Sequence, residues 1–209
     1  MLFLIFSLIV CFTTSTDVVE HLMKSVFAPS KTPIKITRTH LNPQEKEIFK
    51  EYIYKQGYKI RIDVDSGDSI ITTFVYNGKT GFIEGKPVSR IGSLEMVLYG
   101  CKCGYLLAME KTSFSLYEGR EIILVSGKQG NKLYLEYGTL LPMRWEFTNK
   151  TVVFKEYKKI DGLGKVPFLI VKSSLDEVDE ITRITDVEKQ VSISRNFFSV
   201  PKQEIETLD

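Results

Sequence analysis

The sequence predicts a mainly β protein of the α+β kind, with one curled antiparallel sheet and a few short helices. Its ten Tyr and thirteen Phe side chains fit the pleated, half-buried surface of a strand. Residues 59–65 alternate polar and apolar side chains, which is the period of a strand with one wet face and one dry face. A sheet of about ten or eleven such strands has to curl or close to manage its edges.

The N-terminal segment, residues 1–16, has the pattern of a signal peptide. It carries no charged side chain, and Leu2–Phe12 is an apolar run interrupted only by Ser7. A membrane span needs about 20 apolar residues, whereas the core of a signal peptide needs about 7–15. We therefore expect export, with a buried N-terminal strand or helix as the alternative. Val10 precedes Cys11 where a lipobox has a small residue, so the sequence disfavours a lipid anchor at Cys11.

A single folded domain is expected over residues 17–202, and its first element is a short amphipathic helix. Asp17 is a suitable N-cap for this helix, and Pro29 ends it. From Ile34 onward the period changes to two, which indicates strands. The first strand is predicted to begin at residues 34–36, and the others lie, in order, at residues 48–54, 59–65, 70–76, 121–125, 132–137, 143–147, 151–157, 166–172, 180–185 and 188–194.

Turn residues separate the predicted strands, and one helical stretch interrupts them. Asn77-Gly78 is the strongest hairpin signal, because both residues tolerate a positive φ. Between residues 87 and 109 the apolar spacing of three and four residues predicts one or two helices, which would cover the open side of the curled sheet. Residues 203–209 are polar and acidic, and we expect them to form a disordered tail.

Charge and composition argue against several classes of function. The 28 basic and 26 acidic side chains nearly cancel, so there is no concentrated positive charge for a nucleic-acid partner. His21 and His40 are the only histidines, and neither adjoins a nucleophile motif, so we expect no enzyme. Cys101 and Cys103 lie far from both histidines in sequence, and we expect packed or free thiols with no metal and no cofactor.

Four segments resemble the LolA-like superfamily when their order and spacing are taken together. They are an Asn-Gly-Lys hairpin followed by an aromatic strand and a proline, a Leu-Pro strand, an Asp-Gly turn before a proline, and a closing Phe-to-Pro segment. In this sequence they lie at Val75–Pro87, Leu141–Phe147, Tyr157–Pro167 and Phe197–Pro201. The superfamily comprises periplasmic lipoprotein carriers, outer-membrane lipoprotein receptors and related envelope lipid-binding proteins.

The resemblance implies a strongly curved, incompletely closed antiparallel β-barrel, in which a short helical lid covers an apolar cavity. It further implies a monomeric periplasmic protein that shelters lipid or lipoprotein acyl chains, as transport chaperones do, and meets inner- and outer-membrane lipoprotein-sorting partners. Where the carriers have a basic Lys-Arg-Pro turn, this chain has Lys55, Gln56 and Gly57. A non-catalytic envelope sensor or protein-interaction module of the same fold is therefore the alternative.

The residues expected to line the cavity follow from the alternation within strands and from the interrupting helix. Core packing without any ligand is the alternative for each of them, because a cavity wall and a core have the same sequence pattern. The predicted ligand-binding residues are Ile60, Ile62, Val64, Phe74, Phe82, Leu94, Val97, Leu98, Leu133, Leu135, Tyr137, Met143, Trp145 and Phe147.

Overall fold

The computed structural model describes residues 30–88, 109–127 and 130–199 of the 209-residue chain. No helix within these residues has the length and apolar character that a membrane span requires. Several predictions lie outside the described residues. They are the signal peptide, the helix that begins at Asp17, the tail at 203–209, the pair Cys101 and Cys103, and the predicted ligand-binding residues Leu94, Val97 and Leu98.

The described residues form one antiparallel sheet. Its thirteen strands are β1 (Ser30–Leu41), β2 (Glu47–Gly57), β3 (Lys59–Asp65), β4 (Ile70–Tyr76), β5 (Gly81–Ile83), β6 (Lys86–Val88), β7 (Met109–Tyr117), β8 (Arg120–Gly127), β9 (Lys132–Glu136), β10 (Pro142–Phe147), β11 (Lys150–Ile160), β12 (Gly164–Ser174) and β13 (Glu177–Lys189).

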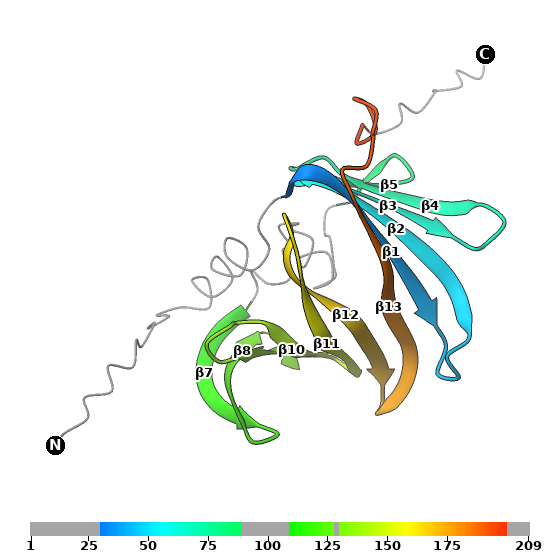
Figure 1. The fold of residues 1–209 in the computed structure, drawn as a ribbon. Coiled ribbons are helices and arrows are strands. Elements are labelled where there is room, and N and C mark those ends of the chain that lie inside the picture. Colours follow the sequence, from blue (N-terminus) through cyan, green and yellow to red (C-terminus); the bar gives the residue numbers. More distant parts are fainter. Residues whose placement is uncertain (1–29, 89–108, 128–129, 200–209) are drawn as a thin grey trace, which may run out of the picture.

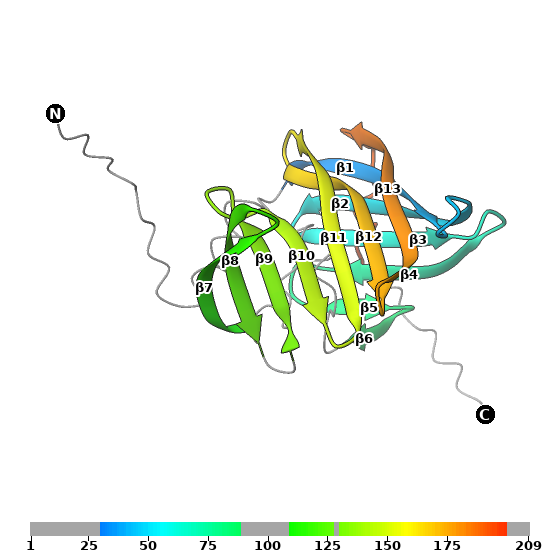
Figure 2. The same ribbon diagram turned by 90° about the horizontal axis from the view of Figure 1, so that it is seen from below.

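The strands follow the order β6-β5-β4-β3-β2-β1-β13-β12-β11-β10-β9-β8-β7 across the sheet. The strands β1 and β13 are therefore neighbours near its centre, with β1–β6 forming one arm and β7–β13 the other. Figures 1 and 2 show the sheet bending so that the two arms turn toward the same side, while the edges β6 and β7 stay apart. This confirms the predicted strongly curved, incompletely closed antiparallel sheet.

A cluster of buried apolar side chains joins the two arms. Ile36, Ile53 and Ile62 lie in one cross-strand row of β1, β2 and β3. Leu163 and Val166, from the hairpin between β11 and β12, pack in the same cluster. All five side chains are buried, so the hydrophobic effect holds the arms together at this point. We call the face of the sheet that bears this cluster the concave face.

The hairpin at Asn77 and Gly78 is present as predicted, between β4 and β5. The Asn77 side-chain oxygen accepts hydrogen bonds from the backbone N–H groups of Lys79 at 2.9 Å and Thr80 at 3.0 Å. Gly78 has a φ of 96°, which costs glycine little because it has no Cβ. The local sequence therefore fixes this turn, and through it the pairing of β4 with β5.

One strand prediction is wrong at the C-terminal end of the sheet. The sequence predicted separate strands at 180–185 and 188–194, but β13 runs without interruption over Glu177–Lys189. The pairing with β1 skips Thr185, which is the extra residue of a β-bulge. Because a bulge breaks the alternation of side chains, the sequence pattern there looks like the end of one strand and the start of another.

The helices predicted between residues 87 and 109 fall outside the described residues, and only the two limits of that stretch are described. Pro87 lies in β6, and Met109 begins β7. The short strands β5 and β6 contain three residues each, too few to show an alternating pattern. The predicted strands fall in ten of the observed strands, and the three that were missed, β5, β6 and the nine-residue β7, bring the total to thirteen.

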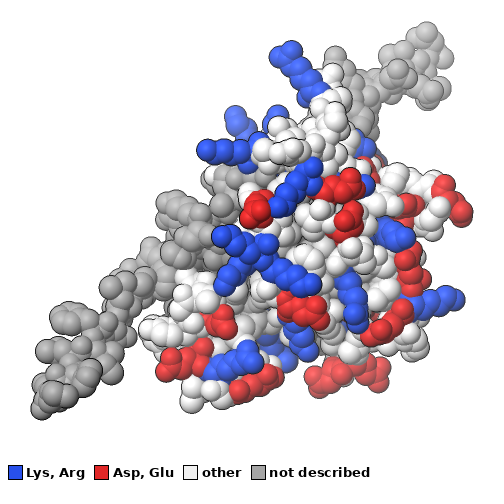
Figure 3. Space-filling model, in the orientation of Figure 1, with Lys and Arg blue, Asp and Glu red and all other residues white. Residues whose placement is uncertain are grey.

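The convex face carries the segment that follows β13. The Phe197 ring centre lies 4.8 Å from that of Tyr54 and 4.7 Å from the guanidinium carbon of Arg61, and Phe198 is buried. The C-terminal end of the described chain is thereby fixed against β2 and β3. Elsewhere on the surface, Figure 3 shows side chains of both charges interspersed over the face in view.

Candidate functional site

One cross-strand row on the concave face is entirely apolar. Val125 of β8 pairs with Leu133 of β9, Leu133 pairs with Trp145 of β10, and Trp145 pairs with Val152 of β11. All four side chains are buried, and Trp145 is 3% exposed. Directly paired residues of antiparallel strands lie on one face about 5 Å apart, so these four form a continuous strip, which we call the apolar row.

Four predicted ligand-binding residues lie on this arm of the concave face. Leu133 and Trp145 belong to the apolar row. Leu135 is buried two residues beyond Leu133, and the Phe147 ring lies 4.3 Å from the Trp145 ring between centres. The structure therefore brings these four side chains together, as the alternation of β9 and β10 predicts.

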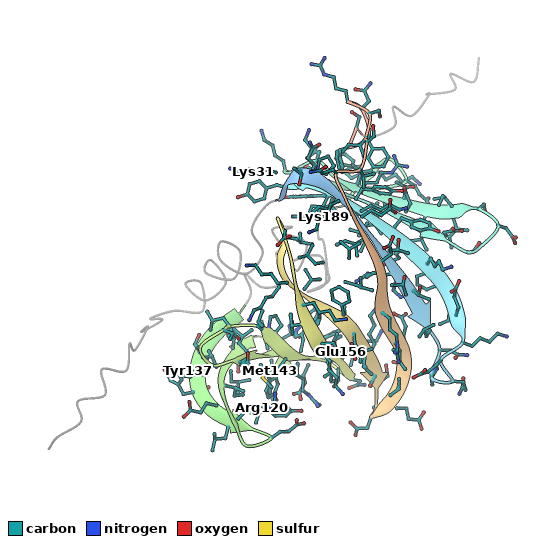
Figure 4. The ribbon with its side chains drawn as sticks, in the orientation of Figure 1. Lys31, Arg120, Tyr137, Met143, Glu156 and Lys189 are labelled. Carbon is teal, nitrogen blue, oxygen red and sulfur yellow. The ribbon has the colours of Figure 1, made fainter. Side chains whose placement is uncertain are left out.

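Tyr137 and Met143 occupy less regular positions on the same arm, where Figure 4 labels both. Tyr137 follows the end of β9, is 38% exposed, and packs edge-on against Phe114 with 5.8 Å between ring centres. Met143 is half-buried at a slip in the pairing of β9 with β10, because Pro142 and Arg144 pair with consecutive residues of β9. Met143 is thus the extra residue of a bulge and does not pair within the apolar row.

The predicted residues of β3 and β4 lie near the core cluster that joins the arms. Ile60 and Ile62 belong to this cluster, and Phe74 packs against it. Val64 is half-buried and pairs with Glu51 of β2. These side chains share the concave face with the apolar row, but Ile60 and Ile62 are already enclosed by side chains of the other arm.

Phe82 does not share the concave face with Phe74. Phe82 of β5 pairs with Val75, the neighbour of Phe74 in β4, and paired residues lie on the same face. The loop at residues 77–80 sets this register, which places Phe82 on the convex side. The prediction that Phe74 and Phe82 both face inward is therefore wrong for Phe82.

The apolar row leads directly to charged side chains that the sequence analysis did not single out as a site. Val152 pairs with Lys172 of β12, and Lys172 pairs with Glu180 of β13. The Lys172 Nζ donates to Glu180 Oε1 at 2.8 Å, and Thr182 Oγ1 donates to the same oxygen at 3.1 Å. His40 Nδ1 also lies 2.8 Å from Glu180 Oε1.

His40 connects Glu180 to a second carboxylate on β2. His40 Nε2 lies 3.0 Å from Glu51 Oε2, and the two form an ion pair when His40 is protonated. The guanidinium of Arg38 donates to the same oxygen through Nε, at 2.9 Å, and through Nη2. We call Arg38, His40, Glu51, Lys172 and Glu180 the ionic cluster; it spans β2, β1, β13 and β12, at the centre of the sheet.

The protonation of the ionic cluster follows from these contacts. Burial alone would lower the pKa of His40, but its contacts with the carboxylates of Glu180 and Glu51 outweigh burial and raise that pKa. Burial alone would raise the pKa of Glu180, but bonds from His40 and Lys172 lower it to about 2. Burial alone would also raise the pKa of Glu51. The positive charge of Arg38 and the contact with His40 outweigh burial and bring that pKa well below its usual range.

A sequence signal for part of the ionic cluster does exist. Arg38 and His40 continue the two-residue spacing of Ile34 and Ile36, so all four side chains of β1 share one face. The sequence predicted that a strand begins at Ile34 and Ile36, but it singled out neither Arg38 nor His40 as part of a site. His40 is in fact 2% exposed and stacks on Phe49, with 4.1 Å between ring centres.

The concave face thus combines an apolar strip with one polar spot. The strip is apolar and buried, and the spot places charged hydrogen-bonding groups at its end. An amphiphilic molecule has this same division into chain and head. The arrangement is therefore suited to binding such a molecule.

Comparison with known proteins identifies the fold. No protein-family model matches the sequence, and no curated protein matches it. The structure is similar to that of a LolA superfamily protein from Nitrosomonas europaea, with a TM-score of 0.57, 10% identity, and coverage of 89% of this chain and 97% of that chain.

Two further solved structures are similar over nearly their whole length. A DUF1329 family protein from Desulfovibrio piger has a TM-score of 0.56 and 13% identity, covering 88% of this chain and 95% of that chain. A domain from Vibrio parahaemolyticus, named for outer membrane lipoprotein sorting, has a TM-score of 0.52 and 10% identity, covering 90% of this chain and 96% of that chain. The chain therefore has a LolA-like fold.

Proposed function

We propose that this protein binds the acyl chains of a lipid or lipoprotein on its concave face, as a non-catalytic carrier or binder in the bacterial periplasm. The observation that carries the proposal is the apolar row on the inner face of a LolA-like sheet. Neighbours named for the LolA superfamily and for lipoprotein sorting support a role in the cell envelope. The uncharged apolar segment at residues 1–16 supports export.

Acyl chains need this kind of shelter to move through water. Each buried methylene is stabilised by about 0.8 kcal/mol, so a long chain leaves a membrane only for a comparably apolar surface. The edges β6 and β7 do not pair with each other. An open sheet gives a ligand a way in and out without breaking backbone hydrogen bonds, which a carrier requires for release.

Uptake of a fluorescent fatty acid tests the proposal. The wild-type protein should bind the probe, and Tyr137→Glu should bind it at least about tenfold more weakly, because the added charge costs more than one tenfold step of 1.4 kcal/mol beside an acyl chain. Tyr137 packs against Phe114, whose partner Ile123 pairs with Leu135 of the concave face. Tyr137 is partly exposed, so its substitution leaves the fold intact, with the fluorescence of the single Trp as the check. Tyr58→Glu, at an exposed turn residue, is the matched control and should bind like the wild type.

Two outcomes would overturn the proposal. Failure of the wild-type protein to take up the probe would contradict binding of acyl chains altogether. Equal uptake by Tyr137→Glu and by the wild type would contradict the assignment of the binding surface to the concave face.

A second candidate function, a sensor or protein-interaction module, is favoured by the edge strand β7. Phe114 and Leu116 of β7 are 64% and 71% exposed. An edge strand with exposed apolar side chains is a template on which a partner adds a strand. The uptake experiment separates the two candidates, because a module of this kind would leave the fatty acid in solution.

A further inference from the structure

We propose that β7 is the interface of a two-fold dimer, in which it pairs antiparallel with β7 of a second copy of this chain. Figure 1 shows β7 at the outer end of its arm of the sheet. The inference goes beyond the proposed function and does not rest on it. The dimer stands in place of the monomer that the resemblance to the LolA-like superfamily implies.

The two edges of the described sheet differ in how they meet a further strand. The edge strand β6 contains three residues, and one of them is Pro87, which has no N–H to offer a partner. Short edge strands that contain Lys or Pro are protected from further pairing. The edge strand β7 has nine residues and no proline, and among the described strands it pairs only with β8. One edge is therefore closed to a further strand and the other is open.

The turn between β7 and β8 determines which backbone groups of β7 are open. Tyr117 pairs with Arg120 across a two-residue turn, in which both residues have a positive φ. In such a hairpin the two residues that flank the turn bond each other, and bonded pairs then alternate along the strands. Thr112, Phe114 and Leu116 therefore point their N–H and C=O groups away from β8, toward the outside of the sheet.

The side chains at these open positions include an exposed apolar patch. Phe114 is 64% exposed and Leu116 is 71% exposed, and the two lie on the same face of β7. Tyr137 packs edge-on against Phe114 and is itself partly exposed. Residues 112–117 carry no charged side chain. A strand that adds to this edge therefore covers apolar surface as well as forming backbone hydrogen bonds.

The charges at the two ends of this stretch identify the partner as a second copy. Lys111 precedes residues 112–117 and Glu118 follows them, and both side chains are exposed. In an antiparallel pair of two β7 strands, Lys111 of each copy approaches Glu118 of the other, so opposite charges meet at both ends. A parallel pair would bring like charges together. The edge is therefore complementary to itself, as the isologous interface of a two-fold dimer requires.

The apolar side chains select the register of this pair. Directly paired residues lie on the same face of a sheet, so the two-fold axis is perpendicular to the sheet and passes through one residue of β7. With the axis at Ser115, Phe114 of each copy lies opposite Leu116 of the other. Both exposed apolar side chains of each copy are then covered by those of its partner, and direct apolar pairs of this kind stabilise an antiparallel sheet.

The two neighbouring registers are less favourable. With the axis at Phe114, Glu110 of each copy would lie opposite Glu118 of the other, and like charges that face each other are destabilising. With the axis at Ser113, Glu110 would lie opposite Leu116, which places a carboxylate beside the apolar side chain. The register centred on Ser115 avoids both contacts.

Sedimentation velocity on the full chain, at concentrations up to about 1 mM, measures the dimer. One strand from each copy makes a small interface, for which we expect a Kd of about 100 μM. Lys111→Glu should weaken the dimer about tenfold, because two contacts in each dimer change from attraction to repulsion. The double variant Lys111→Glu with Glu118→Lys exchanges the charges and should recover the wild-type affinity. Lys79→Glu, at an exposed turn of the other arm, is the matched control and should dimerise like the wild type.

Single cysteines test the register, in a chain whose three native cysteines are replaced by serine. Ser115 of the two copies forms a pair without backbone hydrogen bonds, in which the Cα atoms lie about 4.5 Å apart, within the range of a disulfide. Ser115→Cys should therefore give a disulfide-linked dimer when a thiol oxidant is added. Ser113 is also exposed on the same face, but it lies opposite Tyr117 of the other copy. Ser113→Cys is therefore the matched control and should stay unlinked.

Three results would overturn the inference. They are a wild type that stays monomeric over the whole concentration range, a dimer that Lys111→Glu leaves unchanged or that the double variant does not restore, and a disulfide formed by Ser113→Cys in place of Ser115→Cys. A monomer would leave the β7 edge to a different protein. Uptake of the fatty acid is a separate measurement, so the dimer and the proposed function stand or fall independently.

Discussion

Replacing Glu180 by Gln removes the charge at the centre of the ionic cluster and keeps the shape of the side chain. Glu180 Oε1 accepts from Lys172 and Thr182 and faces His40 Nδ1 at 2.8 Å. A neutral amide at this position weakens the attraction to Lys172 and to protonated His40. We therefore expect Glu180→Gln to lower the free energy of unfolding at pH 7.

The size of the effect follows from the pKa of Glu180. Lowering that pKa from 4.5 to about 2 corresponds to roughly 3 kcal/mol at 1.36 kcal/mol for each pH unit. Solvent reaches about a fifth of the side chain, and its screening reduces the expected loss to about 2 kcal/mol. A carboxylate with a lowered pKa stabilises the fold above its unfolded value of 4.5 and loses this contribution as the pH falls toward 2. The difference between wild type and variant should shrink over that range.

Urea denaturation, followed by the fluorescence of the buried Trp145, measures both quantities at pH 7 and at pH 3. Glu177→Gln, which changes an exposed carboxylate at the start of the same strand, should leave the unfolding free energy within about 0.5 kcal/mol of the wild type. A loss below about 0.5 kcal/mol for Glu180→Gln at pH 7, or a loss that is the same at pH 3, would refute the reasoning about the ionic cluster.

Three further predictions concern other parts of the sheet. The pKa of His40 is raised above 6.5 in the folded protein. Its contribution to stability is therefore complete below pH 6.5 and is lost as the pH rises through the folded pKa. A proton NMR titration should find the His40 midpoint above 6.5, and a midpoint below 6.5 would contradict this. Gly78→Ala should cost about 1 kcal/mol in thermal denaturation because of its positive φ. The added Cβ would lie 3.8 Å from Tyr58 Cβ, an ordinary contact that adds no clash; an unchanged melting temperature would refute the strain. Phe198→Ala should cost about 3 kcal/mol in urea, because its ring is buried at the convex face; a loss near zero would show that this segment does not support the sheet.

The sequence predicts most of the regular structure, because local chemistry determines it. The turn at Asn77 and Gly78 depends on residues within that turn, and the inward position of Trp145 follows from alternation within one strand. Alternation fails where the pairing slips, as at Thr185 and Met143, because a bulge depends on the partner strand. The prediction of the face on which Phe82 lies failed for a related reason, because that face depends on the register of the β4–β5 hairpin.

The ionic cluster as a whole could not be predicted from the sequence alone, although the spacing in β1 places Arg38 and His40 on one face. Its members come from β1, β2, β12 and β13, and the pairing that unites Arg38, His40, Glu51, Lys172 and Glu180 joins the two ends of the folded chain. A charged residue in a strand is expected to face water, unless a partner that is distant in sequence neutralises it. Such partners are visible only once β1 is known to pair with β13.

Native mass spectrometry with lipid extraction tests the central claim most directly, on full-length protein purified without detergent from a bacterial envelope. We predict that the protein carries a bound acyl lipid or acylated lipoprotein, which added palmitate displaces. A protein that is repeatedly empty, and that stays empty after incubation with palmitate, would contradict the claim that its concave face binds acyl chains.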